Sequence, residues 1–114
     1  MVDVPAERFA ELVEEALDGI PDELSRLMDN VAVMVDDDSP PGELFGHYQG
    51  IPLTQRANYG AMALPDTITV FRQTICAACD SLEAVVAQVR KTVLHEVAHH
   101  FGIDDTRLRE LGWT

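Results

Sequence analysis

Two histidines four residues apart, His95 and His99, are the side chains of this sequence best suited to chemistry, and Glu96 lies between them in an H-E-x-x-H pattern. Residues four apart lie one turn apart on one helix face, so both imidazoles can reach a single metal ion. Zinc is the usual ion, bound by histidine nitrogen at about 2.0–2.1 Å. Successive helix residues diverge by about 100°, so Glu96 cannot chelate on the same vector. The pattern therefore predicts Glu96 as the general base that acts on a zinc-activated water.

A third ligand is predicted from the residues that follow. Gly102 lies three residues after His99, and Asp105 lies six residues after it. A glycine in the left-handed conformation ends a helix and turns the chain, so that the side chain at position 105 can swing back toward the ion. Either Asp104 or Asp105 could instead cap the next helix. We predict one zinc ion per chain, held by His95, His99 and Asp105, with the open fourth position that is typical of catalytic sites.

A long helix has to carry the two histidines. Asp80 and Glu83 form a capping-box pattern that predicts the helix start, and Gly102 predicts its end. An apolar stripe should face the core, and its centre lies about 160° around the helix from His95 at 100° per residue. The histidines are therefore expected to point away from the core. The stripe consists of Leu82, Val85, Val86, Val89, Val93 and Val97.

Shorter elements surround this helix. A length of 114 residues predicts one domain spanning residues 1–114. The predicted further helices cover residues 5–18, 22–29 and 106–111, and the predicted strands cover residues 31–35, 44–48, 51–54 and 68–72.

The charge of the chain excludes several kinds of partner. Eight basic and twenty acidic residues give a net charge of −12, without the basic footprint that nucleic acids or anionic membranes require. No apolar run approaches the roughly 20 residues that span a bilayer, and no secretory signal is visible, so we expect a cytoplasmic protein. The acidic residues concentrate in residues 1–43, which indicates a solvated face or a surface that selects cationic substrates.

Cys76 and Cys79 form a C-x-x-C pair whose role the sequence leaves open. We favour two buried, passive thiols, and a disulfide or a redox-active pair are the alternatives. A structural zinc would need two further ligands, which the sequence does not supply.

The extended pattern from His95 to Asp105 resembles the zinc-binding motif of metzincin peptidases, in the variant whose third ligand is aspartate. More closely, the chain resembles a family of small, stand-alone zincin-like metallopeptidases. The matching stretches are residues 46–56, 64–72, 93–105 and 110–113. The resemblance implies a minimal zincin-like α+β fold, in which a small β-sheet packs on the active-site helix. It also implies an edge strand beside the cleft, which we assign to Ile68–Arg72. An extended peptide would pair with that strand by strand addition.

One feature of large metzincins is missing, because they carry a methionine-containing turn after the third ligand. Nine residues follow Asp105, and none is methionine. We therefore expect a site without the lower half that binds substrate in a large peptidase.

These observations predict a zinc metallohydrolase, and specifically a metallopeptidase that acts on a peptide or protein substrate. The alternative is a catalytically weak, zinc-bound module that binds peptides, although such a module would not need Glu96 as a base. We expect His100 to pack or support the site and His47 to be a loop histidine. The sequence does not identify the oxyanion-stabilising residue, for which the candidates are Tyr48, Tyr59 and Arg56.

Overall fold

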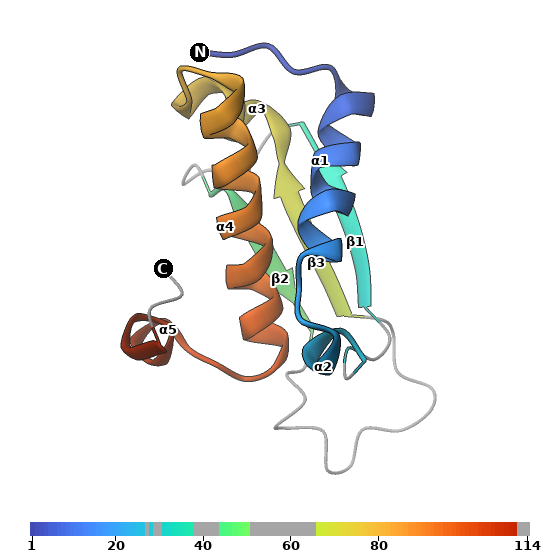
Figure 1. Cartoon of the computed structure of the whole chain (residues 1–114), viewed down its shortest axis with the longest axis vertical. Coiled ribbons are helices and arrows are strands. Elements are labelled where there is room, and N and C mark those ends of the chain that lie inside the picture. The colour runs from blue at the N-terminus through green and yellow to red at the C-terminus, as the bar shows by residue number, and fades with distance from the viewer. Residues whose placement is uncertain (27, 29–30, 38–43, 51–65, 112–114) are drawn as a thin grey trace.

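Eight helices and strands make up the described part of the chain in a computed structural model, which covers residues 1–26, 28, 31–37, 44–50 and 66–111 (Figure 1). Of residues 23, 24, 105, 108 and 111 only the backbone is described. The elements are α1 (Ala6–Asp18), α2 (Asp22–Ser25), β1 (Val31–Asp36), β2 (Gly46–Gln49), β3 (Asp66–Phe71), α3 (Arg72–Ala78), α4 (Leu82–His100) and α5 (Asp105–Leu111).

The sheet has the strand order β1-β3-β2, with β1 parallel and β2 antiparallel to β3. Ile68 at the middle of β3 faces Val33 of β1 on one side and Tyr48 of β2 on the other. Our assignment of Ile68–Arg72 as the edge strand is therefore wrong, since this stretch forms the central strand and Arg72 already belongs to α3. Alternating apolar residues are common to edge and central strands, so the pattern could not separate them.

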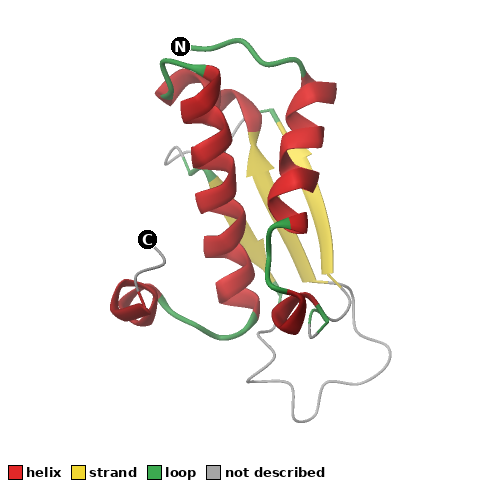
Figure 2. Cartoon of the chain, viewed as in Figure 1, coloured by secondary structure: helices red, strands yellow, loops and turns green. Residues whose placement is uncertain are grey.

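Helices α1 and α4 lie together over one face of the sheet, as Figure 2 shows. The faces that they bury meet the apolar side of β3, so one core holds the two layers together. The α+β fold with a small mixed sheet packed on the long helix is confirmed. The core includes Phe9, Leu12 and Val13 of α1, Ile68 and Val70 of β3, and Val85, Val89, Val93 and Val97 of α4.

The start of α4 differs from the prediction by one residue. Ser81 is the cap, and its side-chain oxygen accepts a hydrogen bond of 3.1 Å from the backbone nitrogen of Ala84. Asp80 is exposed and lies one position too early for this role. The first helical residue, Leu82, is 49% exposed and does not join the buried stripe. No described helix is long and apolar enough to cross a membrane.

Candidate metal centre

The last two turns of α4 bring His95, Glu96 and His99 together, with one ligand atom from each residue within 4.8 Å of the others. The two imidazole rings lie 4.5 Å apart between centroids, with an interplanar angle of 68°. Both histidines are half-buried, so they face neither the core nor open solvent. The spacing of four residues therefore places the two rings where a single ion can contact both.

Glu96 is buried, with only 6% of the residue exposed. Its Oε1 lies 3.2 Å from Nδ1 of His99. When Nδ1 of His99 carries the proton and donates a hydrogen bond to Glu96, the lone pair that can bind a metal lies on Nε2. The hydrogen bond therefore fixes both the carboxylate and the ring orientation of the neighbouring imidazole. Sequence reasoning had identified Glu96 but had not predicted that it is buried.

Gly46 explains how strand β2 comes so close to Glu96. A Cβ atom at position 46 would lie 2.6 Å from Cγ2 of Thr92, 3.2 Å from the carbonyl oxygen of Thr69 and 3.3 Å from Cγ of Glu96. Real Cβ contacts are longer than the first of these, so only glycine fits without movement. The absent side chain lets β2 pack directly against α4 at the catalytic candidate.

The chain turns sharply after α4, in the way that the spacing of Gly102 predicts. Gly102 has a φ of 78° and donates a 2.9 Å hydrogen bond to the carbonyl of His99, and Ile103 donates one of 3.0 Å to the carbonyl of Ala98. This pair of bonds is the Schellman motif, in which a left-handed glycine ends a helix. After this turn the chain leads to α5, which lies to one side of the lower end of α4 (Figure 1).

Asp104 caps the short helix α5, since its Oδ1 accepts a 2.8 Å hydrogen bond from the backbone nitrogen of Arg107. Asp105 is the first residue of α5. The side chain of Asp105 lies outside the described part of the structure, so its role as the third ligand stays a prediction. Of the two aspartates that could cap α5, Asp104 does so.

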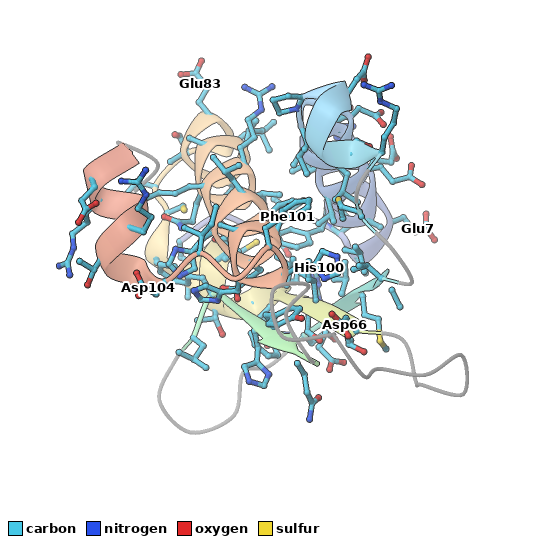
Figure 3. The ribbon with its side chains drawn as sticks, turned by 90° about the horizontal axis from the view of Figure 1, so that it is seen from below. Glu7, Asp66, Glu83, His100, Phe101 and Asp104 are labelled. Atoms are coloured by element: carbon cyan, nitrogen blue, oxygen red, sulfur yellow. The ribbon has the colours of Figure 1, made fainter. Side chains whose placement is uncertain are left out.

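A polar cluster made of Tyr48, Asp66 and His100 packs between the end of α4 and the sheet. Asp66 and His100 are buried, and Tyr48 is half-buried. Nδ1 of His100 lies 2.9 Å from Oδ2 of Asp66, and both side chains are completely buried. The hydroxyl of Tyr48 donates to the same oxygen at 2.5 Å, and the Tyr48 ring meets the edges of His99 and His100 at centroid distances of 6.5 and 6.1 Å. In Figure 3, His100 and Asp66 lie next to each other on the sheet side of α4. The cluster joins α4 to β2 and β3 immediately behind the metal-ligand candidates.

This cluster fits the expectation that His100 packs rather than binds the metal. Sequence reasoning missed Asp66 because its partner is 34 residues away. The residues next to Asp66 in the sequence carry no signal that could have identified this partner.

A cleft of about 240 Å³ lies beside the metal-ligand candidates. Leu44, Phe45 and Gly46 line it from the sheet side, and Lys91, His95 and Glu96 are among the residues that line it from α4. A ligand in this cleft would contact both the imidazole of His95 and the carboxylate of Glu96.

The remaining candidate residues have other positions. His47 lies exposed on β2, so the expectation of a loop histidine is wrong. The hydroxyl of Tyr48 donates to Asp66, so it is already engaged. Arg56 and Tyr59 lie outside the described residues.

Cys76 and Cys79 lie outside the centre as free, buried thiols in the core. Burial raises the pKa of Cys79, and the neighbouring Cys76 raises it further. Redox-active cysteines need a lowered pKa, so these features favour the passive pair over the redox alternative.

Comparison with known proteins adds a family and a fold. The model of the zincin-like metallopeptidase family matches residues 28–113. Among solved structures, the chain is similar to a conserved hypothetical protein from Thermus thermophilus, with 24% sequence identity and a TM-score of 0.56. The match covers 95% of this chain and 97% of the other, and at this identity it supports the fold alone. A search of curated proteins found no match.

Proposed function

The chain belongs to the zincin-like metallopeptidase family, and from that membership we propose that it is a zinc-dependent peptidase that hydrolyses peptide bonds in the cleft beside His95. The observation that carries this proposal is the cluster of two imidazoles and one buried carboxylate within 4.8 Å, at the wall of that cleft.

The donor set fits zinc, because imidazole nitrogen and carboxylate oxygen are both common zinc ligands. His95 and His99 would supply the nitrogens. We assign the third position to Asp105, since Asp104 is engaged as the helix cap and the chain turns at Gly102, three residues before Asp105. A bound zinc ion supplies Lewis acidity to a peptide carbonyl and lowers the pKa of water.

Glu96 is the proposed general base. Glu96 lines the cleft, and its carboxylate is oriented by the hydrogen bond to His99. It accepts the proton of the attacking water and later delivers it to the leaving amine. Only 6% of Glu96 is exposed, so bulk water has little access to its side chain.

The peptide is proposed to lie along β2. Strand β2 is at the edge of the described sheet, and Gly46 at its start lines the cleft. An extended peptide can add main-chain hydrogen bonds to an outer strand, whereas Ile68–Arg72 has described partners on both sides. We also propose a cytoplasmic location, for which free thiols are the supporting feature.

Replacement of Glu96 by glutamine tests the proposed function. Glu96→Gln keeps the size of the side chain and removes the base, so zinc content and melting temperature should persist while cleavage of a mixed peptide library falls by about 10²–10⁴-fold. Glu83→Gln is the matched control, because Glu83 is an exposed glutamate in the first turn of the same helix (Figure 3). Equal cleavage by wild type and Glu96→Gln would contradict the proposal.

A further inference from the structure

Lys91 is the only lysine of a chain whose net charge is −12. It is exposed on α4 and lines the cleft beside the metal-ligand candidates. Arg8, Arg72 and Arg107 each pair with a carboxylate of the chain. Lys91, in contrast, makes no hydrogen bond or ion pair with any residue that the structure describes. Its ammonium group is therefore available to a ligand in the cleft.

The position of Lys91 relates its charge to the proposed scissile bond. It precedes His95 by four residues, which is about one turn or 6 Å along the helix on the same face. An extended peptide advances by about 3.3 Å per residue. A peptide bond held beside His95 and Glu96 therefore has its next one or two residues within reach of the Lys91 side chain.

The surroundings of Lys91 identify the matching chemistry. Leu44, which is 45% exposed, and Phe45 form an apolar wall of the cleft, so the cleft combines an apolar surface with one cation. The remainder of the protein is acidic and repels anions at long range. A carboxylate close to the cleft would find its favourable partner at Lys91, where the short-range attraction exceeds the screened repulsion.

We propose that Lys91 selects peptides that carry a carboxylate within one or two residues of the cleaved bond. This inference rests on the proposed peptidase function. The carboxylate can be that of an aspartate or glutamate side chain or that of the C-terminus of the peptide, and both present the same charge to the lysine.

Cleavage kinetics test the selection with matched peptides. The probes are acetylated, C-amidated octapeptides without charge except for one glutamate moved along the sequence, with glutamine versions as partners. A second series compares free and amidated C-termini and separates the two sources of the carboxylate. At the best position we expect the glutamate peptide to exceed the glutamine peptide in kcat/KM by about fivefold, and the ratio to fall with added salt.

Variants of α4 assign that preference to Lys91. Lys91→Gln should reduce the ratio of the glutamate to the glutamine peptide to about one. Lys91→Glu should reverse the preference, so that the glutamine peptide is cleaved faster than the glutamate peptide. Arg90→Gln is the matched control, since Arg90 is the adjacent exposed cation and does not line the cleft. A general loss of structure would lower all rates and would not exchange the preferred peptide. A ratio near one for wild type with every peptide, while cleavage is measurable, would overturn the inference and leave the peptidase function standing.

Direct binding gives a readout that does not need turnover. Reductive methylation with ¹³C labels only the Lys91 and Met1 amines. The Met1 amine lies 3.6 Å from Oδ1 of Asp80, and Met1 does not line the cleft. Adding the glutamate peptide to Glu96→Gln protein with zinc should shift the Lys91 methyl signal and leave that of Met1 unchanged. A Lys91 shift without cleavage by wild type would support carboxylate recognition and contradict the peptidase function. An unchanged Lys91 signal at saturating peptide would overturn the inference.

Discussion

Replacing Gly46 with alanine should force β2 away from α4 beside the proposed base. The added methyl carbon would lie 2.6 Å from Cγ2 of Thr92 and 3.2 Å from the backbone oxygen of Thr69. The second neighbour belongs to the central strand β3 and cannot rotate away. Overpacking of this kind costs about 1–3 kcal/mol, and we expect a loss of about 2 kcal/mol from the free energy of unfolding. At roughly 4 °C per kcal/mol for a domain of this size, the melting temperature should fall by about 8 °C.

A second substitution assigns the strain to one contact. Thr92→Ser removes the Cγ2 methyl group and keeps the hydroxyl, which accepts a 3.1 Å hydrogen bond from Nε2 of Gln88. The Gly46→Ala, Thr92→Ser double variant should therefore be about 1 kcal/mol more stable than the sum of the single effects predicts. Urea unfolding followed by circular dichroism measures all four proteins of this cycle.

Gly19→Ala is the control for the loss of a glycine. Gly19 has a φ of −80°, and a Cβ there would lie 3.4 Å from the nearest atom, the carbonyl oxygen of Ala16, so the substitution should leave stability unchanged within about 1 kcal/mol. Two results would refute the close approach of β2 and α4. One is strict additivity of the effects of Gly46→Ala and Thr92→Ser on stability, and the other is a Gly46→Ala protein as stable as wild type.

Three further predictions concern the buried cluster, the third ligand and the thiols. Asp66→Ala leaves a buried histidine without its acceptor, so the free energy of unfolding in urea should fall by about 3–5 kcal/mol. Asp105→Ala should weaken zinc binding strongly in a competition titration, whereas Asp104→Ala should cost only about 1 kcal/mol of stability through the lost cap; the reverse order would contradict the proposed ligand. Because burial raises the pKa of Cys79, its thiol stays protonated at neutral pH, and both cysteines should react with a thiol reagent at least about tenfold faster in urea than in buffer; equal rates would show that the thiols are accessible.

Local signals explain which parts of the site could be predicted from the sequence. The histidines, Glu96 and the turn at Gly102 follow from spacings within a single helix and its end, where 3.6 residues per turn fixes which side chains meet. The apolar periods likewise predicted α1, α4, β1 and β3, because a helix or strand buries one face at a fixed repeat. The strand predicted at residues 51–54 lies outside the described residues, and the short helix α3 was not predicted.

Long-range contacts explain what was missed. Asp66 meets His100 across 34 positions, and nothing in its immediate neighbours distinguishes it from a loop aspartate. Gly46 resembles an ordinary turn glycine, although its role is to admit α4 beside β2. Alternation within Ile68–Arg72 could not reveal that partners lie on both sides of this strand. Each of these features depends on a second segment, which a one-dimensional pattern does not contain.

Zinc titration of the metal-free protein with a mixed peptide library tests the central claim most directly. Cleavage should be absent without metal, rise with added zinc and reach a plateau at about one equivalent per chain, because the described residues contain one cluster of candidate ligands. Mass spectrometry of the peptides at each step measures the extent of cleavage. An unchanged library at every zinc concentration, with one equivalent bound, would contradict the peptidase account and favour a zinc-bound module that binds peptides.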